Sequence, residues 1–352
     1  MTYIERMHNK MKVLRTKKTV RILAIESSCD DTGVAIVQNG RQVLSNVLSS
    51  QIDIHTRFGG VVPEIASRNH IMAIMPLVDK ALKDAHLTLQ DIDAIGVTQG
   101  AGLVGSLLVG LTTAKALSFA LDIPLIACNH IKGHICANYL TYQDLTPPFG
   151  CLVVSGGHTA VVGVTDYTHL KLFGTTIDDA IGESFDKVAR VVGLGYPGGP
   201  KIDQISKGIV PKIQFVHHTA LKDSPNFSFS GLKTAVINYV HNETTKGNTL
   251  DIPQICASFQ AEAVSMVVTK AIKLCLVNNL STLCVAGGVS ANSYLRNQLT
   301  LAGQENGIKV LFPESKYCTD NGAMIGSYAY YLMLSGDCST LDIPALPNIP
   351  LE

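Results

Sequence analysis

The sequence is poor in charge and has no cysteine pattern typical of a disulfide or zinc framework. Only 16% of its 352 residues are charged and 46% are apolar, so the composition favours a folded chain with a large core over a disordered one. None of the nine cysteines forms a CxxC pair, and most lie in apolar runs. We therefore expect buried thiols in a reducing compartment, namely the cytoplasm.

The sequence also lacks an uninterrupted apolar run long enough to cross a membrane. Its most apolar stretch, residues 101–127, is broken by Lys115, Asp122 and Pro124. The N-terminus lacks the long apolar core of a secretory signal. Its basic character weakly resembles an organelle transit segment, which leaves the mitochondrial matrix as the alternative location. No membrane partner is expected.

Positive charge is scarce outside the first residues. Basic and acidic residues balance at 28 each, but residues 1–21 hold seven basic residues and one acidic residue. We expect residues 1–20 to form a flexible basic arm. The rest of the chain is acidic, so binding of a nucleic acid requires a local positive surface or one supplied by a partner.

The chain is too long for one ordinary core, and its pattern repeats. An apolar run, a polar turn and a second apolar run occur after residue 20 and again near residue 150. Helical and strand patterns then alternate in each half, which predicts a duplicated α/β protein. We expect a first domain over 21–148, a second over 149–335 and a C-terminal tail over 336–352.

Three loops have small and polar residues where a strand ends: "ESSCDDT" (26–32), "VSGGHT" (154–159) and "AGGVSAN" (286–292). Small residues let backbone N–H groups approach an anion, although any one such loop is equally an ordinary turn. Neither GxxxxGK[ST] nor GxGxxG follows the first strand. Asp30 and Asp31 would repel a phosphate unless a metal lies between, or they serve only as turn and capping residues.

The stretch "NHIKGH" (129–134) carries two histidines four residues apart. On a helix both would share one face, as metal ligands or as ordinary helix residues. Asp320 in "YCTDNGAMIG" offers a third ligand, and two histidines with one carboxylate suit Fe(II) or Zn(II). Ile131 stands where a zinc protease has its glutamate, which argues against proteolysis. His217 and His218 are expected to be surface histidines.

These motifs, taken together, resemble one family. They are "IESSCDDT", "GGVVPEIASRNH", "TQGAGLVGSLLVG", "NHIKGH", "VSGGHT", "GESFDKVAR", "GYPGGP", "FSFSGLKT", "GGVSAN" and "DNGAMI", in family order from about residue 22 to 330. The chain is identified as a member of the tRNA threonylcarbamoyladenosine transferase family, which comprises bacterial TsaD and its archaeal, eukaryotic and mitochondrial relatives.

The resemblance implies an actin/Hsp70/sugar-kinase-like (ASKHA) fold, with two related RNase H-like domains around a nucleotide cleft. It implies transfer of threonylcarbamoyl from threonylcarbamoyl-AMP to N6 of adenosine 37 in tRNAs that read codons beginning with A, with release of AMP. It assigns one divalent metal, Fe2+ with Zn2+ as the alternative, to His130, His134 and Asp320. The implied acyl-adenylate contacts are Val153, Val154, Ser155, Gly156, Gly157, Asp186, Gly199, Asp203 and Asn292. Asp30 and Asp31 are the candidates for proton transfer or for the phosphate loop.

The implied partners are tRNA and TsaB- and TsaE-like proteins. Lys132 stands where the family often has glutamate, and Ala101 where it usually has proline. Three other functions remain as alternatives. A non-catalytic scaffold subunit would lack the metal ligands, an ATPase or sugar kinase of the same fold would lack the NHxxGH pair, and an endopeptidase would need the missing glutamate.

Overall fold

The computed structural model describes residues 2–216, 221 and 224–352, which form two compact units. Unit 1 contains the chain up to Pro147 together with 165–170 and 313–352, and unit 2 contains 148–164 and 171–312. The first boundary lies one residue from the expected one. The second does not lie at 335, because 313–335 belongs to unit 1. His217 and His218 lie outside the described residues.

The sheet of unit 1 has the strand order β3-β2-β1-β4-β5. The predicted first hairpin is its antiparallel β1–β2 pair, and β4 and β5 extend the sheet in parallel from β1. The strands β1, β2 and β4 are almost continuously buried, which suits their apolar and β-branched sequences. Their bounds are Arg21–Glu26 (β1), Asp31–Gln38 (β2), Gln42–Ser50 (β3), Ala94–Gly100 (β4) and Leu125–Asn129 (β5).

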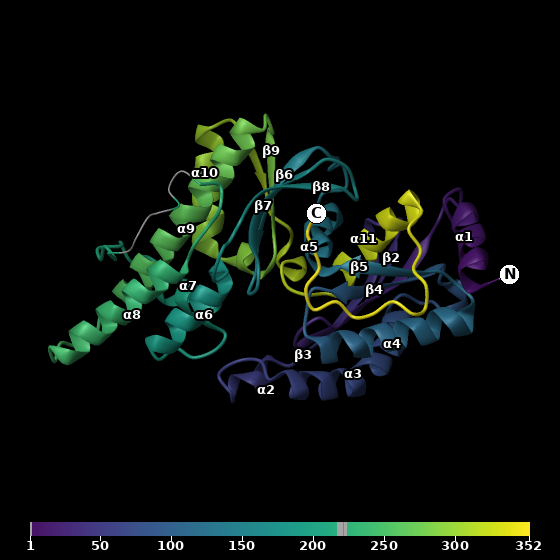
Figure 1. The fold of residues 1–352 in the computed structure, drawn as a ribbon, viewed down its shortest axis with the longest axis horizontal. Helices are drawn as coiled ribbons and strands as arrows, with labels where there is room; N and C mark the ends of the chain where they lie inside the picture. The colour runs from purple at the N-terminus through teal and green to yellow at the C-terminus, as the bar shows by residue number, and fades with distance from the viewer. Residues whose placement is uncertain (1, 217–220, 222–223) are drawn as a thin grey trace. The chain divides into compact units, whose positions relative to one another are not determined.

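Helices cover both faces of this sheet. In Figure 1, α3 and α4 lie on one face and α11 lies on the other with α5, in agreement with the contacts between these elements. The helix α11 packs against β1 and β2, which is why the end of the chain belongs to unit 1. The helices are Tyr3–Leu14 (α1), Ile52–Thr56 (α2), Pro63–Asp84 (α3), Val104–Leu121 (α4), His130–Thr141 (α5) and Gly322–Ser335 (α11).

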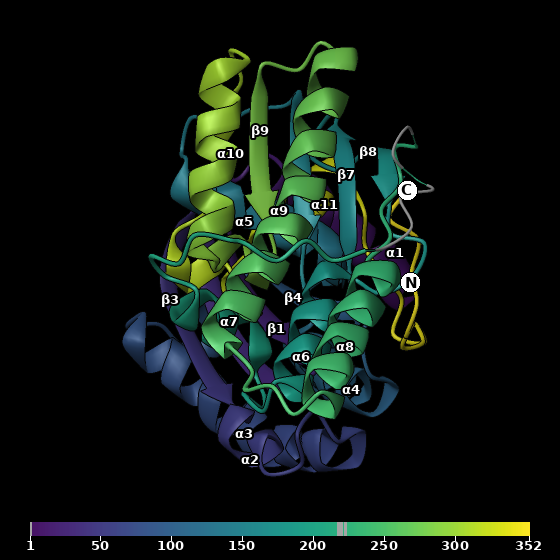
Figure 2. The ribbon, with the colours of Figure 1, turned by 90° about the vertical axis from the view of Figure 1, so that its left-hand side faces the viewer.

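The sheet of unit 2 has the order β10-β9-β6-β7-β8. Figure 2 shows α9 and α10 lying over β9. The strands are Phe149–Val154 (β6), Thr159–Val164 (β7), Leu170–Thr175 (β8), Thr282–Ala286 (β9) and Lys309–Leu311 (β10). The helices are Ile181–Val191 (α6), Gly198–Ile205 (α7), Ser230–Thr245 (α8), Ile252–Val277 (α9) and Ser293–Glu305 (α10), and short 3-10 turns cover Leu89–Asp91, Gly288–Ala291 and Ser315–Tyr317.

The two sheets repeat one topology. In each unit the first strand pairs antiparallel with the second and parallel with the fourth, and the fifth strand lies outside the fourth. This repeat confirms the duplication predicted from the two strand–turn–strand patterns. Two helices, α4 and α9, are long and apolar enough to cross a membrane by length and composition alone. Most of the apolar stretch of α9 is buried in the core of unit 2, whereas only 33% of that of α4 is buried.

The expectation of a flexible basic arm at residues 1–20 is wrong. Residues Tyr3–Leu14 form α1, which starts with a capping box between Thr2 and Glu5. Met7, Met11 and Leu14 recur with helical spacing and are buried. The positive charges of the segment predicted an exposed arm, but this apolar stripe packs the helix onto unit 1.

Candidate functional site

The two predicted histidines begin a helix that follows directly on a buried strand. Asn129 ends β5 and caps α5, because its side-chain oxygen accepts hydrogen bonds from the backbone N–H groups of Ile131 (2.9 Å) and Lys132 (3.2 Å). His130 is the first residue of the helix and His134 lies one turn later, and both are buried. The cap thus fixes the helix start at the first histidine.

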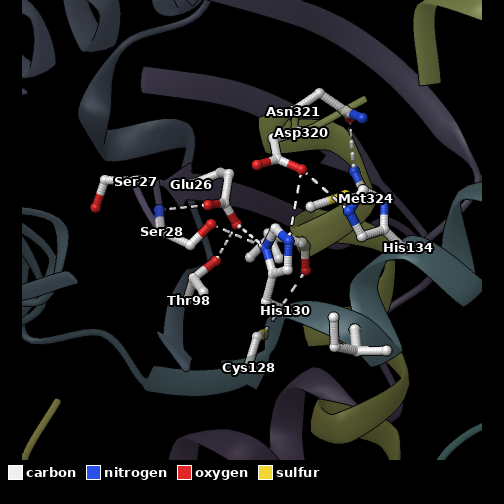
Figure 3. A network of polar contacts seen from close by, with 12 residues as sticks. Glu26, Ser27, Ser28, Thr98, Cys128, His130, His134, Asp320, Asn321 and Met324 are labelled. Carbon is white, nitrogen blue, oxygen red and sulfur yellow. Dashed lines mark hydrogen bonds and ion pairs between the residues drawn. The ribbon is translucent and has the colours of Figure 1, made fainter. Parts of the chain in front are cut away.

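Asp320 completes the group from the loop before α11. Its Oδ1 lies 3.0 Å from Nε2 of His134 and 3.5 Å from Nε2 of His130. Figure 3 shows both imidazoles turned toward this carboxylate. Asn321, the next residue, caps α11 by accepting the backbone N–H of Met324 at 3.0 Å. Two helix caps therefore hold the histidine pair close to Asp320, which lies 186 residues after His134 in the sequence.

Gly133 lets the two helices approach. A Cβ built on Gly133 would lie 2.8 Å from Cδ1 of Ile325, closer than real Cβ contacts. The glycine between the histidines therefore has a packing reason that is independent of the metal ligands. Because α5 and α11 lie this close together, the carboxylate of Asp320 reaches both rings.

The side chains around the two histidines carry several charges although most of them are buried. Burial disfavours the charge on His130, but the carboxylates of Glu26 and Asp320 outweigh burial and raise its pKa to about 9. Burial likewise disfavours the charges of Glu26 and Asp320, yet the histidines lower the pKa of both carboxyl groups. The two carboxylates and His130 favour each other's charged forms, and a cation is the natural partner of such a place.

The residues fit a divalent metal ion. His130, His134 and Asp320 each offer a ligand atom, and these atoms all lie within 4.8 Å of one another. Two imidazole nitrogens and one carboxylate oxygen are the donor set of both zinc and non-haem iron sites. The remaining positions of an ion held on one side by three protein ligands stay free for a substrate oxygen.

Asp30 and Asp31 follow the end of β1, in a loop that is held from two sides. The carbonyl of Cys29 accepts the hydroxyl of Ser106 at 3.1 Å and lies 2.9 Å from Nε2 of His70. Asp31 opens β2 and is partly buried. Burial is the largest influence on its carboxyl, and neighbouring carboxylates add to it, raising the pKa to about 7. A group with this pKa exchanges a proton near neutral pH.

Unit 2 contains a cavity of about 460 Å3 at the ends of its strands. Five of the predicted adenylate contacts line it: Gly156, Asp186, Gly199, Asp203 and Asn292. The other lining residues are Gly182, Phe185, Pro200, Gln204, Lys207, Gly288, Val289 and Ala291. The remaining predicted contacts, Val153, Val154, Ser155 and Gly157, do not line it. Val153 and Val154 are fully buried in β6, so their side chains support the loop from within.

Two carboxylates that line this cavity accept hydrogen bonds from other segments of unit 2. Asp186 accepts the backbone N–H of Gly198 at 2.7 Å, and burial raises the pKa of Asp186. Asp203 accepts the hydroxyl of Ser293 at 2.8 Å.

Asn292 was expected to read a base edge or a ribose. Its side-chain oxygen caps α10 on Leu295, and its amide nitrogen donates to Gln260 at 2.8 Å. Its side chain therefore has one donor and one acceptor site left for a ligand.

Sequence reasoning named no role for several residues that support the metal group. Glu26 and Thr98 lie at the ends of β1 and β4, where the strands meet α5. His70, which holds the loop of Asp31, is fully buried on α3. All three lie inside the motifs quoted above, but a buried hydrogen-bond partner has no signature in one sequence. Lys207 is the only basic residue that lines the described cavity, and no motif marks it.

Comparison with known proteins gives a family for this architecture. The model of the family "tRNA N6-adenosine threonylcarbamoyltransferase" (TsaD) matches residues 42–327. The chain is 54% identical over 340 residues to a protein of that name from Clostridium novyi (strain NT), covering 95% of this chain and 98% of the relative.

Solved structures agree on the fold. Component A of (R)-2-hydroxyglutaryl-CoA dehydratase from Acidaminococcus fermentans matches 89% of this chain and 99% of its own at a TM-score of 0.52 and 14% identity. Full-length HypF in a phosphate- and nucleotide-bound form matches 89% of this chain and 46% of its own at a TM-score of 0.58 and 13% identity. With the repeated sheet topology, these matches confirm the predicted actin-like α/β fold of two related units.

Proposed function

The chain belongs to the tRNA N6-adenosine threonylcarbamoyltransferase family, and we propose that it transfers threonylcarbamoyl from threonylcarbamoyl-AMP to N6 of adenosine 37 in tRNAs reading codons that begin with A. The products are t6A and AMP. The observation that carries the proposal is the convergence of His130, His134 and Asp320, because a non-catalytic scaffold would not need to keep this set intact.

The reaction is acyl transfer from a mixed anhydride, so the leaving group is already good. The protein must hold the adenylate, exclude competing water and align a weak amine nucleophile with the carbonyl carbon. A bound metal ion supplies Lewis-acid polarisation of a carbonyl or phosphate oxygen. The chain's own contribution to this step is the fixed orientation of the two histidine rings and of Asp320.

The adenylate would bind in the cavity of unit 2. Its volume, about 460 Å3, suits a nucleoside monophosphate. Gly156 and Gly199 have no neighbour within 4 Å of a built Cβ, so the space in front of their backbone is open to a ligand. Asp186 and Asp203 carry carboxylates toward ribose hydroxyls. Val153, Val154, Ser155 and Gly157 would act through the backbone of their loop, and Asn292 chiefly by capping α10.

Asp31 is the candidate general base for the N6 proton. Its pKa of about 7 leaves it ionised and still basic at neutral pH. Asp30, its neighbour on the same loop, is the candidate that orders a water molecule. His70 and Ser106 fix the backbone that carries both residues.

One Fe2+ per chain is the proposed cofactor, with Zn2+ as the alternative. Two histidines and one carboxylate with open positions form the ligand pattern of non-haem iron, and the same three ligands also suit catalytic zinc. Metal analysis of protein purified without oxygen distinguishes the two.

TsaB- and TsaE-like proteins are the proposed partners beside tRNA. The support is an apolar surface on two helices that pack together, α3 and α4. Its exposed side chains are Ile71, Met72, Met75, Val104 and Leu108. Such a surface on a chain this poor in charge suits a related chain. Paired charge substitutions Met72→Glu and Leu108→Glu should abolish co-elution with a TsaB-like protein while leaving the unfolding midpoint of the isolated chain unchanged.

The proposed location is the cytoplasm. The nine cysteines are free thiols, and seven of them are buried, which suits a reducing compartment. Fractionation of cells that express the tagged chain tests this, with the mitochondrial matrix as the alternative where the host has one.

A single-turnover assay tests the activity. Purified protein is incubated with unmodified tRNA and threonylcarbamoyl-AMP, and the digested nucleosides are analysed by mass spectrometry. His130→Ala should form no t6A. His169→Ala is the matched control, because this histidine is exposed and pairs only locally with Asp166. The assay is repeated with TsaB- and TsaE-like proteins added, and absence of t6A in that arm would contradict the proposed function.

A further inference from the structure

Glu26 is a carboxylate with no exposure to solvent at all. It ends β1, and three donors surround it: the backbone N–H of Ser28 at 2.5 Å, the hydroxyl of Thr98 at 2.5 Å and Nδ1 of His130 at 3.0 Å. A buried charge is costly unless every lone pair has a partner and the charge has a counterpart. These three donors serve the two oxygens of the Glu26 carboxylate. The positive counterpart of its charge lies on the side of His130.

The contact fixes which nitrogen of His130 carries the proton. An ionised carboxylate only accepts hydrogen bonds, so Nδ1 must be the protonated nitrogen where it faces Glu26. The other nitrogen, Nε2, faces Asp320 at 3.5 Å. When His130 carries this proton alone, the lone pair of Nε2 is free and faces the place where the ligand atoms of the triad converge (Figure 3).

The charges also match. With both histidines neutral, Glu26 and Asp320 carry two negative charges within one buried network. These two charges compensate a divalent cation, whereas loss of the Glu26 charge removes half of that compensation in a largely buried place. His134 has no such support, since its Nδ1 is buried and has no hydrogen-bond partner among the described residues.

We infer that Glu26 is the positioning residue of the metal centre: it holds His130 in the Nδ1–H tautomer, turns Nε2 toward the ion and supplies one of the two compensating charges. This inference rests on the metal site of the proposed function. A carboxylate behind a metal-bound histidine typically changes metal affinity by 10–100-fold when it is removed.

The variant Glu26→Gln isolates this role. If the amide oxygen faces Thr98 and His130, the amide nitrogen meets the N–H of Ser28, donor against donor. If the amide is turned, its nitrogen donates to His130 and stabilises the Nε2–H tautomer, which has no lone pair for the ion. Either arrangement weakens the metal site without removing a ligand.

Thr98→Val is the matched control. It removes a buried hydrogen bond to the same oxygen of Glu26 but leaves the carboxylate and its contact with His130. Affinities for Co2+ are measured on the full chain by competition with a chromophoric chelator. We expect about a 10–100-fold loss for Glu26→Gln and less than threefold for Thr98→Val. The Co2+ visible spectrum of Glu26→Gln should also change, which a loss of stability alone would not cause.

Two further measurements make the inference falsifiable. In a His130→Ala background, Glu26→Gln should cause a smaller loss of Co2+ affinity than it causes in the wild-type background, because its effect on the tautomer needs that ring and only the effect of its charge remains. In the zinc-loaded wild type, long-range proton–nitrogen NMR should show His130 protonated at Nδ1 and metal-bound at Nε2, which needs no variant to fold.

The outcomes separate the two levels. If the wild type binds no Co2+ in a His130-dependent way, the metal site itself is overturned, and the role of Glu26 with it. If His130→Ala loses affinity but Glu26→Gln binds Co2+ as tightly as Thr98→Val, or if NMR finds Nδ1 on the metal, only the role of Glu26 is overturned.

Discussion

Gly322, the first residue of α11, lies against the backbone of Ala35 in β2. A Cβ built on Gly322 would lie 2.6 Å from the backbone nitrogen of Ala35, and one built on Gly33 would lie 2.7 Å from the nitrogen of Gly322. Neither neighbour is a flexible side chain that moves aside. Asp320 lies two residues before this contact, so the separation of β2 and α11 sets the position of the third ligand.

Gly322→Ala should therefore destabilise unit 1 and weaken its metal site together. Forcing a methyl group into a packed backbone contact costs about 1–3 kcal/mol of unfolding free energy. The free energy is measured by denaturant titration and the metal affinity by chelator competition. Gly157→Ala is the control, because nothing lies within 4 Å of a Cβ there. Wild-type stability and wild-type affinity in Gly322→Ala would contradict this account of the site.

The sequence predicts the parts of this molecule whose signal is local. The two hairpins, the buried strands and the helix that starts at His130 each follow from periodicity or a motif, and the triad follows from the family resemblance. The membership of Asp320 in unit 1 could not be predicted, because it depends on α11 packing on β1 and β2 far back in the sequence.

Other features were not predicted, because a more obvious pattern occurred in the same segment or because the feature has no pattern in the sequence. The basic residues of the first segment hid the stripe of Met7, Met11 and Leu14, although its spacing was readable. The capping role of Asn292, which also lines the cavity, was not predicted, although an asparagine before a helical pattern is typical of a cap. Glu26 has no pattern of its own, since a buried carboxylate is recognised only by what surrounds it in the fold.

Contact of the cavity with ligand is tested by Gly199→Ala. A Cβ at Gly199 meets no atom of the chain within 4 Å, so the unfolding free energy of the variant should lie within about 0.5 kcal/mol of that of the wild type. The methyl group would instead occupy the cavity that Gly199 lines. We expect about a tenfold loss of affinity for AMP or a stable acyl-adenylate analogue, measured by calorimetry. His169→Ala, a change at an exposed residue of unit 1 that does not line the cavity, should bind as the wild type does. Equal affinity in both variants would exclude Gly199 from the ligand site.

The packing of α1 is tested by comparing the replacement of a buried apolar residue of the helix with the replacement of a charged residue that pairs with it. Met7 is fully buried, so Met7→Ala should cost about 2–5 kcal/mol, or the full docking energy of the helix if that is smaller. Asp122 pairs with Arg6 and Lys10 at an exposed place, where solvent screens the charges, so Asp122→Ala should cost much less stability than Met7→Ala. Hydrogen exchange of the α1 amides reads both effects. Rapid exchange of these amides in the wild type would contradict the packed helix and support a flexible arm.

The carboxyl of Asp31 should make the metal-free protein less stable as the pH rises from about 4 to about 7. Its pKa is raised to about 7 by burial and neighbouring carboxylates, whereas an unfolded aspartate titrates near 4. The folded state therefore binds this proton more tightly than the unfolded state does. Below pH 4 both states are protonated and no cost exists; between the two values the cost grows by up to about 1.4 kcal/mol per pH unit, and above pH 7 it is fully present.

Asp31→Asn removes this titration while keeping the shape of the protonated side chain. Its unfolding free energy should rise relative to that of the wild type between pH 4 and pH 7, and the difference should be constant on either side. Denaturant titrations at several pH values, with chelator present in both proteins, measure the difference. The same variant should lose t6A formation at pH 7 if Asp31 accepts the N6 proton. Parallel stability curves for the two proteins would mean that Asp31 titrates as an ordinary aspartate, and a base with an ordinary pKa would be poorly matched to neutral pH.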